Sequence, residues 1–493
     1  MTELVLGLDQ GTSSTRCLAL DRGLGQRGAA AIPVRAAFPA PGLVEQDPHE
    51  LLASARAAIA GALADAGARG TDVVAFGIAN QTETFIVAER ASGQPVHPAI
   101  GWQDRRTAGR CAELAAAGHA PSVRARTGLE LDPTFPATKL AWLLDHVGGA
   151  RGRAEAGELS YHDVGGWLVR HLAGLDACEV GNAGRTLLCP LGGVDWDDDL
   201  LGLFEIPRTL LPPIVASDAI GELARVGPGG AGAEPPLTAV IGDQQASLFG
   251  LGCRETGTAK VTLGTGAFVL AQAGTTAPQP PPGVLASCAW RRRGETSYAL
   301  EGFVPAAGAA LDWFTAVGVL PPAAELDALL RSAGPEDGSV ACVPALQGLG
   351  TPSWDPATGA ALLGLTRATT RAHVARAVVD GVLHQVADAL AAIAAQIPLT
   401  TVLLDGGMSR SDWIVQRLAD IADVRIERAA RSEATAIGAA MMAGLAAGFW
   451  GEVDELPEVV IDLVAEPSWP ASERAERRER WSRALALARR WRR

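Results

Sequence analysis

Several short polar segments contain residue types that can act on hydroxyl groups and phosphates. The segment Gly242-Asp243-Gln244-Gln245 places a carboxylate beside two amides, directly after the apolar run 237–241. A carboxylate at the end of a strand can serve as a general base for an attacking hydroxyl, and the amide of Gln244 can bind that hydroxyl. The alternative is structural, with Asp243 as the N-cap of the helix that follows. Asp243 could also fill both roles.

Three turns that contain glycine could bind a nucleotide. In Asp9-Gln10-Gly11-Thr12-Ser13-Ser14-Thr15-Arg16, a glycine turn exposes backbone N–H groups beside several hydroxyls. Asp9 can hold Mg²⁺ through water, and Arg16 can meet phosphate oxygens. The other two turns are Gly264-Thr265-Gly266 and Asp405-Gly406-Gly407, where paired glycines allow close approach of a ring or a phosphate. Each of these turns alone could be an ordinary connection. All three in this order are a more specific indication of a nucleotide site.

Two further segments could line a pocket for a ligand with several hydroxyls. They are Asn80-Gln81-Thr82-Glu83-Thr84, which follows the apolar run 73–78, and Trp102-Gln103-Asp104-Arg105-Arg106. The carboxylate of Glu83 can accept hydroxyl hydrogens, while the indole of Trp102 can pack on carbon. The alternative for Trp102 is a place in the hydrophobic core.

The elements that must position these segments are those of a mixed α/β fold. Apolar strand and helix patterns alternate, and ligands in such folds bind beyond the carboxyl ends of strands. In chain order we expect a hairpin of strands 5–8 and 17–20, a helix 48–68, strands 73–78 and 237–241, a second hairpin of strands 260–263 and 267–271, a helix 370–396 and a strand 401–404. After residue 243 the pattern begins again, so we expect two related domains.

Length and charge narrow the class of protein. The chain has 493 residues, and single cores stop growing near about 250–300 residues, so two domains with a boundary near 245–255 are expected. A formal net charge of −13 disfavours nucleic-acid binding. The only lysines, Lys139 and Lys260, lie outside any G-x-x-x-x-G-K-[ST] pattern, which excludes a P-loop.

The cysteines and the apolar runs bear on location. Seven cysteines at irregular spacings indicate reduced thiols and a cytoplasmic protein. The N-terminal residues lack the basic start of a signal peptide. No apolar run reaches the roughly 18–20 residues of a membrane span, so no membrane insertion is expected.

The end of the chain, from about residue 470, is rich in arginine and carries Trp481 and Trp491 at roughly helical spacing. We expect a terminal helix that packs its aromatic side chains on the body of the protein. The alternative is a surface for a partner or for an anionic ligand.

Together these segments resemble the FGGY carbohydrate kinases, and among them the glycerol kinases most closely. The similarity runs nearly end to end, and the forms at 80–84 and 242–245 favour polyol kinases over xylulose kinases. Other segments that carry the resemblance are Pro41-Gly42-Leu43-Val44-Glu45-Gln46-Asp47-Pro48, Thr138-Lys139, Trp142-Leu143-Leu144-Asp145-His146, Gly348-Leu349-Gly350-Thr351-Pro352-Ser353-Trp354-Asp355-Pro356, Gly364-Leu365-Thr366-Arg367, Thr435-Ala436-Ile437-Gly438-Ala439-Ala440 and Gly444-Leu445-Ala446-Ala447-Gly448-Phe449-Trp450.

The resemblance implies two ribonuclease-H-like α/β domains of the actin/sugar-kinase ATPase type, with ATP and Mg²⁺ in the cleft between them. It implies a polyol- and phosphate-binding domain over 1–250, an ATP-binding domain over 251–465 and an Arg-rich helix over 466–493. The implied reaction is ATP-dependent phosphorylation of a terminal hydroxyl of a small polyol, as in glycerol to glycerol 3-phosphate. The family leaves a homodimer and a homotetramer open.

The resemblance also assigns roles by matching position. Asp243 would be the general base and, with Asp9, would hold Mg²⁺. The ATP phosphates would contact Thr12, Ser13, Ser14 and Arg16. The ADP site would be lined by Thr265, Gly308, Gly407 and Ser411, the last in place of a common Asn near the adenine. The polyol pocket would contain Glu83, Trp102, Asp243, Gln244 and Phe268, with Thr82 and Thr134.

Two departures from the family pattern concern the substrate. Thr82 stands where glycerol kinases have Arg, and Thr134 where they have Tyr; both of those residues normally hydrogen-bond glycerol. Each lost charge-assisted hydrogen bond costs about 1.5–3 kcal/mol, or roughly 10–150-fold in affinity. The smaller side chains also widen the pocket, so the hypothesis is a longer polyol or sugar, such as erythritol, threitol, a pentitol or a ketose. The alternative is that the threonines hold waters and glycerol remains the substrate.

A further departure from the family pattern concerns regulation. Some bacterial glycerol kinases bind fructose 1,6-bisphosphate through a Gly-Gly-x-x-Gly-x-Arg loop; the matching stretch 229–234 ends in Glu234, so no such inhibition is expected.

The alternative of another class is an ATPase or ligand sensor of the same fold that has lost phosphotransfer. The presence of Asp9, Asp243 and the hydroxyls at 12–15 argues against that loss.

Overall fold

The computed structural model describes residues 3–219, 235–334 and 339–491.

The first sheet contains the N-terminal hairpin. This sheet has the order β11-β5-β1-β2-β3. Its strands are β1 (Leu4–Gln10), β2 (Ser14–Leu20), β3 (Gln26–Pro33), β5 (Val73–Asn80) and β11 (Leu237–Gly242). β1 pairs antiparallel with β2 and parallel with β5, which pairs parallel with β11. The hairpin and both later strands expected from the sequence are therefore confirmed.

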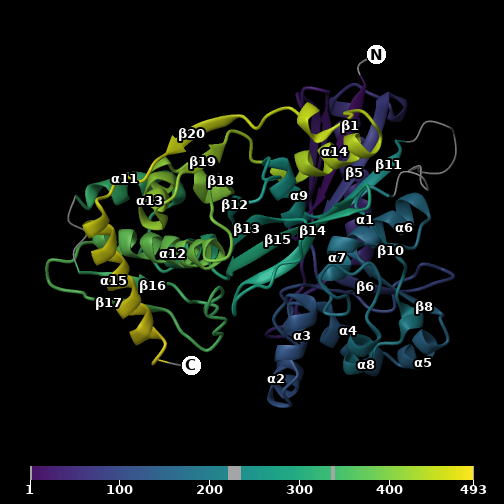
Figure 1. Ribbon diagram of the computed structural model, residues 1–493, viewed down its shortest axis with the longest axis horizontal. Helices are drawn as coiled ribbons and strands as arrows, with labels where there is room; N and C mark the ends of the chain where they lie inside the picture. The colour runs from purple at the N-terminus through teal and green to yellow at the C-terminus, as the bar shows by residue number, and fades with distance from the viewer. Residues whose placement is uncertain (1–2, 220–234, 335–338, 492–493) are drawn as a thin grey trace.

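Helices cover both faces of the first sheet (Figure 1). α1 (Pro48–Asp65) and α6 (Val164–Ala173) pack on one face, where they share a core cluster with Leu6 and Leu8. α9 (Asp243–Gly250) and α14 (Ala434–Ala446) pack on the other, with Val5. Successive side chains of β1 therefore enter opposite cores, as the two-residue period of a buried strand requires.

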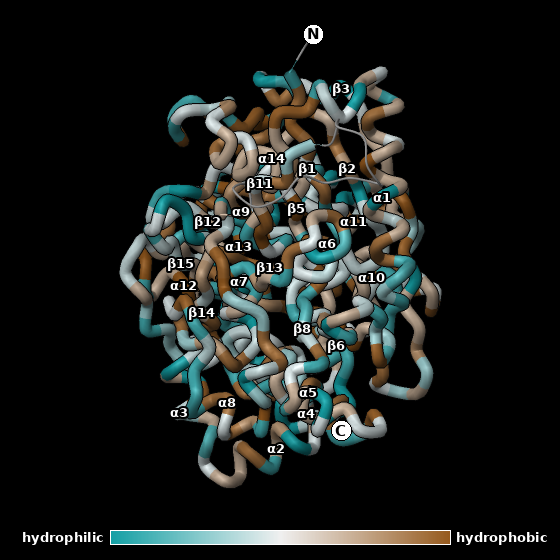
Figure 2. The backbone as a smooth tube through the Cα atoms, turned by 90° about the vertical axis from the view of Figure 1, so that its right-hand side faces the viewer, coloured by the Kyte–Doolittle hydropathy of each residue, from teal (hydrophilic) through white to brown (hydrophobic). Residues whose placement is uncertain are grey.

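Helix α14 comes from the far end of the chain yet lies against the first sheet, as both views of the molecule show (Figures 1 and 2). Two glycines allow this contact. A Cβ atom on Gly7 would lie 1.9 Å from the carbonyl oxygen of Ala436, and one on Gly77 would lie 2.1 Å from that of Ala439. Only residues without a side chain let the helix backbone approach the strands so closely.

The second sheet has the order β14-β15-β13-β12-β18-β19-β20. Its strands are β12 (Thr258–Leu263), β13 (Ala267–Gly274), β14 (Leu285–Arg292), β15 (Glu295–Val304), β18 (Thr401–Asp405), β19 (Ile426–Ala429) and β20 (Ile461–Ala465). β12 and β13 form a hairpin, and β12 runs parallel to β18. The first sheet joins its hairpin to β5 in the same way, so the expected repetition is confirmed.

The helices of the second half surround this sheet. They are α10 (Gly308–Ala316), α11 (Ala323–Ser332), α12 (Arg371–Ala394) and α13 (Asp412–Ala422), with the small ladder of β16 (Ala341–Val343) and β17 (Ala361–Leu363). α12 is long and apolar enough to cross a membrane by composition alone, but 78% of its apolar window is buried in the protein. α12 is therefore a core helix. It confirms the helix expected over 370–396.

A third group of elements lies in the lower part of Figures 1 and 2, and all of it except β4 falls between β5 and β11 in sequence. A four-stranded sheet has the order β4-β7-β6-β8, and β9 pairs with β10. The bounds are β4 (Glu45–Gln46), β6 (Phe85–Glu89), β7 (Ala99–Ile100), β8 (Leu159–Asp163), β9 (Cys178–Glu179), β10 (Ile214–Val215), α2 (Ala108–Ala116), α3 (Ala120–Thr127), α4 (Pro136–His146), α5 (Ala150–Glu155), α7 (Val180–Gly184) and α8 (Asp198–Phe204). This group has its own core, which includes Phe85, Tyr161 and Trp196.

The chain ends in helix α15 (Ala471–Ala488), which runs along the left side of Figure 1. Trp481 is buried, stacks on His384 with 5.2 Å between ring centroids, and donates from Nε1 to Asp388 Oδ2 at 2.8 Å. Trp491 lies beyond the helix and is 77% exposed. The expectation of a packed aromatic is therefore confirmed for Trp481 and wrong for Trp491, because the helix ends before it.

Candidate active site

The polar segments of the first half meet at one edge of the first sheet. Pairing places Gln10 beside Asn80, and Asn80 beside Gly242. The strands β1, β5 and β11 are parallel, so their carboxyl ends and the residues that follow them share this edge. The turn after β1, the segment after β5 and Asp243 after β11 are therefore neighbours, although more than 150 residues separate the last two in sequence.

Asp243 is the first residue of α9, and Gly242 holds the N-cap position. The alternative that Asp243 caps this helix is therefore wrong. Its Oδ1 accepts the backbone N–H of Gln244 at 2.8 Å. Burial raises the pKa of Asp243 to about 6, and Glu83 raises it as well, while Gln244 and Lys260 lower it. A carboxylate with this pKa can accept a proton near neutral pH.

Asp9 lies close enough to Asp243 for the two carboxylates to affect each other. Burial raises the pKa of Asp9 to about 7, with a further contribution from Asp243 and an opposing one from Arg16. The site thus concentrates negative charge that a cation would neutralise. In the described ranges no group of three or more His, Cys, Asp or Glu side chains forms a metal site by itself.

Lys260 joins this edge from the second sheet. Its Nζ donates to Gln244 Oε1 at 2.6 Å and to Thr262 Oγ1 at 2.8 Å. The side chain is fully buried, and burial lowers its pKa although Asp405 and Asp243 oppose this. This contact of Lys260 was not predicted from the sequence. The rarity of lysine was a usable signal, since Lys260 is one of two lysines among 42 basic residues.

Glu83 adopts a left-handed backbone conformation with φ +61°, which is uncommon for a residue with a side chain. Its Oε1 accepts from Arg185 Nε at 2.6 Å, and its Oε2 accepts from Thr82 Oγ1 at 2.6 Å. Backbone strain of this kind tends to occur at ligand sites, because the surrounding structure must hold it in place. Arg185 was missed by sequence analysis, since nothing in its local segment predicts this contact.

Aromatic side chains from the two halves of the chain contact each other. The rings of Trp102 and Phe268 are 6.3 Å apart at 68°. Trp102 is half-buried and donates from Nε1 to Thr12 Oγ1 at 3.1 Å. Trp102 is therefore only partly buried and is connected to the first glycine turn.

Thr134 has hydrogen-bond partners within the protein. Its hydroxyl donates to Asp132 Oδ1 at 2.6 Å, and its carbonyl oxygen accepts from Lys139 Nζ at 3.0 Å. Lys139 is fully buried, and burial lowers its pKa to about 7. Thr134 thus belongs to a hydrogen-bonded wall of the site.

The first turn bears the expected phosphate-binding hydroxyls. Ser13 is exposed and Ser14 half-buried, while the hydroxyl of Thr12 also donates to Gln81 Oε1 at 3.3 Å. Arg16 Nη1 pairs with Glu433 Oε1 at 2.7 Å, just before α14. An arriving phosphate would compete with Glu433 for this guanidinium.

The other two turns lie together at the carboxyl end of the second sheet. The N–H of Gly308, at the start of α10, donates to the carbonyl of Gly264 at 2.9 Å, and that of Ala309 donates to Thr265 at 3.0 Å. Gly406 has φ +95°, and a Cβ there would lie 2.5 Å from the carbonyl oxygen of Leu263. A Cβ on Gly407 would meet nothing within 4 Å, so a ligand can approach its backbone.

Ser411 has a structural use for its hydroxyl. It accepts the N–H of Ile414 at 3.1 Å as the N-cap of α13 and donates to Asp327 at 2.5 Å. The stretch 229–234, on which the expected lack of regulation depends, lies outside the described residues.

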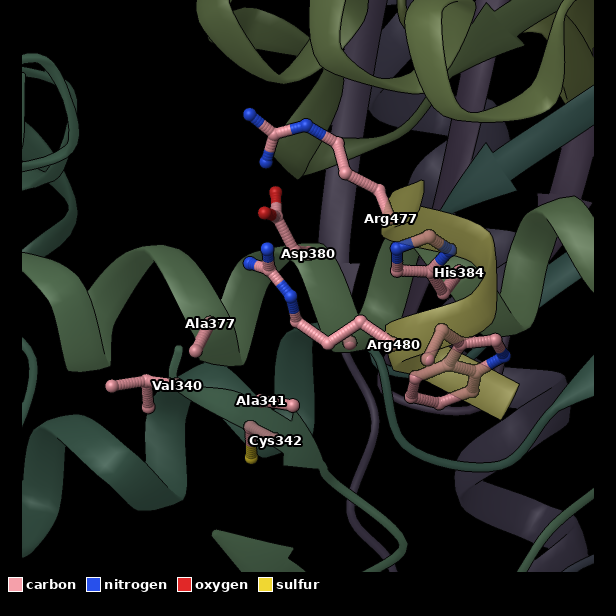
Figure 3. A pocket seen from close by; sticks show the side chains of 10 residues that line it. Val340, Ala341, Cys342, Ala377, Asp380, His384, Arg477 and Arg480 are labelled. Carbon is pink, nitrogen blue, oxygen red and sulfur yellow. The ribbon is translucent and has the colours of Figure 1, made fainter. Parts of the chain in front are cut away.

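A small cavity of about 30 Å³ occurs elsewhere, between α12, β16 and α15 (Figure 3). Asp380, His384, Arg477 and Trp481 are among its lining residues, and the side chains of α12 and α15 face each other across it. No residue expected at the active site lines it.

Known proteins resemble the chain in sequence and in structure. The N-terminal domain of the FGGY family of carbohydrate kinases matches residues 4–250, and its C-terminal domain matches 259–447. A glycerol kinase of Dechloromonas aromatica is 43% identical over 99% of this chain and 98% of its own, and one of Methylobacterium nodulans is 45% identical over 93% and 92%.

Solved structures agree with this relationship. Plasmodium falciparum glycerol kinase with ADP superposes with a TM-score of 0.91 at 26% identity, covering 99% of this chain and 98% of the other. A Brucella ovis xylulose kinase superposes with a TM-score of 0.88 at 25% identity, covering 98% of both. These are sugar kinases with two domains of the actin/ribonuclease-H-like type, the fold seen here. From its sequence matches and its architecture alike, the chain belongs to the FGGY family of carbohydrate kinases.

Proposed function

We propose that this kinase transfers the γ-phosphoryl group of ATP to a terminal hydroxyl of a small polyol, with glycerol as the first candidate. The observation that carries the proposal is the placement of Asp243. Glu83 of the first half and Lys260 of the second both act on its carboxylate, and burial raises its pKa to about 6. The relatives named glycerol kinase, at 40–45% identity, support glycerol as acceptor.

In the proposed reaction, Asp243 accepts the proton of the attacking hydroxyl. Gln244, whose amide oxygen is held by Lys260, binds a hydroxyl through its NH₂ group. Glu83 accepts hydroxyl hydrogens, and Trp102 and Phe268 cover the carbon chain. Phosphoryl transfer requires positioning and charge neutralisation more than covalent work by the protein, and these residues supply both on the acceptor side.

On the nucleotide side, we propose that the turn after β1 binds phosphates and that the second sheet binds ADP. Thr12, Ser13, Ser14 and Arg16 belong to the first group, and Thr265, Gly308, Gly407 and Ser411 to the second. The Plasmodium relative contains ADP, which supports a nucleotide site in this fold. The open space beside Gly407 supports its assignment.

We also propose that Asp9 and Asp243 hold Mg²⁺. The pKa of Asp9, raised by burial and by Asp243, fits a site that lacks positive charge. The ion would neutralise phosphate oxygens during transfer.

A longer polyol or sugar remains a second candidate, because the hydroxyls of Thr82 and Thr134 donate to Glu83 and Asp132. Both hydroxyl hydrogens are therefore used within the protein, and neither replaces a donor to the substrate. This supports an acceptor that fills the space with its own hydroxymethyl group.

The test is turnover of the purified protein with ATP and Mg²⁺ against glycerol, erythritol, threitol, xylitol, dihydroxyacetone and xylulose. We expect ADP formation that depends on the acceptor, with the highest kcat/KM for one of the polyols. The matched control is Asp243→Asn with the same acceptors. ADP formation that no acceptor stimulates would favour the sensor alternative and refute the kinase assignment.

We further propose a cytoplasmic enzyme that forms a homodimer or homotetramer, with domains over 1–250 and 251–465 and a C-terminal helix over 466–493. All seven cysteines are buried free thiols, which supports a reducing compartment. The gap between the two matched family domains, residues 251–258, supports the boundary. α14 packs back on the first sheet, so it would connect the two domains.

A further inference from the structure

A buried ion-pair triad crosses from one half of the protein to the other beside the expected polyol pocket. Its centre is Arg185, which follows α7 and is 8% exposed. Arg185 Nε donates to Glu83 Oε1 at 2.6 Å, and its Nη1 donates to Glu301 Oε2. Glu83 follows β5 of the first sheet, and Glu301 lies on β15 of the second. One side chain thus connects the two sheets.

Each carboxylate of the triad also has a second partner. The other oxygen of Glu83 accepts from Thr82. The other oxygen of Glu301 accepts from Ser287 and, at 3.3 Å, from Gln245 Nε2. Gln245 lies on α9, two residues after Asp243. The network therefore runs from the pocket wall to the helix that carries the proposed base.

The triad holds one positive and two negative charges. Burial lowers the pKa of Arg185, but Glu301 and Glu83 raise it by more, so the guanidinium stays charged. The guanidinium carbon also lies 5.4 Å from the ring centroid of Phe135. Two carboxylates and an aromatic face leave this planar group little freedom, and because its Nε and Nη1 bind different carboxylates, the guanidinium fixes the position of one carboxylate relative to the other.

One member of the triad, Glu83, has a strained backbone conformation. Glu83 has φ +61°, a conformation that persists only where neighbours hold it. Its two side-chain partners are Arg185 and Thr82, and only Arg185 carries charge. Without Arg185, the carboxylate of Glu83 would be a buried anion with no charged partner in its hydrogen bonds, and it would turn toward solvent.

We propose that Arg185 is a positioning residue for the acceptor: it holds Glu83 in the conformation that receives the substrate's hydroxyls and connects that conformation to the second sheet through Glu301. This inference rests on the proposed function. It predicts that loss of the triad weakens acceptor binding and leaves ATP binding unchanged, because the contacts of Arg185 lie on the acceptor side.

The experiment compares Arg185→Lys, Glu301→Gln and the charge-matched double variant R185M/E301Q with the wild-type enzyme. For the double variant we expect the KM of the best acceptor to rise about 10–100-fold, the range for a lost charge-assisted hydrogen bond, with the KM for ATP within about twofold. Arg185→Lys keeps the charge but cannot reach both carboxylates, so its KM should fall between those of wild type and the double variant.

The matched control is the pair Arg417–Asp380, which joins α13 to α12 with side chains 10% and 15% exposed. The variant R417M/D380N should alter thermal stability and leave both KM values unchanged. If the triad is merely structural, R185M/E301Q will behave like this control, and that result overturns the proposal.

Two other outcomes are also decisive. Wild-type acceptor KM in Arg185→Lys and Glu301→Gln would overturn the proposal even if the double variant fails to fold. A wild-type protein that phosphorylates no acceptor would refute the proposed function first, and the role of Arg185 with it. Unchanged KM values in an active enzyme would refute the role of Arg185 alone.

Discussion

At the scale of single residues, the ionisation of Asp243 decides whether it can act as a base. Burial and Glu83 raise its pKa to about 6, so it is mostly ionised at neutral pH and protonated in mild acid. We predict that kcat/KM for the acceptor falls about tenfold per pH unit below pH 6. Initial rates between pH 5 and 8 would check this.

The matching variant is Asp243→Asn. A positioned base contributes about 10²–10⁴-fold, so we expect a loss of kcat in that range with ATP binding retained. Wild-type turnover in this variant, or an acid limb that survives the substitution, would remove Asp243 from the role.

Lys260 acts on the same carboxylate and on Gln244. Its charge lowers the pKa of Asp243, so Lys260→Met should raise that pKa and move the acid limb of kcat/KM to higher pH. The hydrogen bond to Gln244 would also be lost, and we expect a decrease of about 10–100-fold at pH 7. Thr262→Val, which removes only the other partner of Lys260, is the control. An unmoved acid limb in Lys260→Met would contradict the prediction.

Much of the site could be predicted because its residues lie in short motifs. Asp9, Glu83, Asp243 and the glycine turns follow strands whose apolar runs are visible in the sequence. Arg185 and Glu301 could not be found this way, because each is an isolated charge whose partner lies about a hundred residues away. A buried charge is recognisable only once its surroundings are known.

At the scale of elements, the packing of α14 on the first sheet depends on glycine. Gly77→Ala would place a Cβ 2.1 Å from the carbonyl oxygen of Ala439, and neither backbone can move away without disturbing the sheet. Overpacking of this kind costs about 1–3 kcal/mol or more, so we expect a clear loss of thermal stability, measured by calorimetry or circular dichroism.

The control for this prediction is Gly109→Ala. Gly109 is exposed in α2, and a Cβ there would meet nothing within 4 Å. Alanine is favoured over glycine in a helix by about 0.5–1 kcal/mol, so this variant should be as stable as wild type or more so. Equal stability of Gly77→Ala and wild type would show that the contact is looser than described.

The C-terminal helix offers a second test among the elements. Trp481 is buried between α12 and α15, whereas Trp491 is 77% exposed. Removing a buried tryptophan costs about 3–5 kcal/mol, so Trp481→Ala should unfold at a lower temperature and Trp491→Ala should match wild type. KM values unchanged in both would agree with a structural role for the helix, while equal stability of the two variants would contradict it.

The elements themselves were predicted well, because hairpins, buried strands and long helices leave local periodic patterns. What local patterns could not give was the place of α14 or the end of α15. The sequence around 434–446 is apolar on all sides, which says only that it is buried; the strands β5 and β1 on which it packs lie some 350 and 420 residues earlier in the chain. Trp491 continued the expected spacing, but the helix ends at Ala488.

At the scale of the whole molecule, two segments far apart in the sequence meet at the turn after β1. Arg16 of β2 pairs with Glu433, which precedes α14, although 417 residues separate them. The Arg16 side chain is 43% exposed, and such pairs contribute about 0–1 kcal/mol to stability. The pair therefore contributes little to the free energy of folding. Its larger effect would be on the binding of an anion by Arg16.

We predict that Glu433→Gln lowers the KM for ATP by about two- to fivefold, because a neutral side chain competes less with phosphate oxygens for the guanidinium. The KM for the acceptor and the melting temperature should stay at wild-type values. Glu452→Gln is the matched control. Glu452 Oε1 forms an exposed ion pair with Arg293 Nη1 at 2.7 Å, and this pair does not involve the turn. If the KM for ATP is the same in Glu433→Gln as in this control, Arg16 does not bind the phosphates, and the turn after β1 must hold them through its backbone and hydroxyl groups alone.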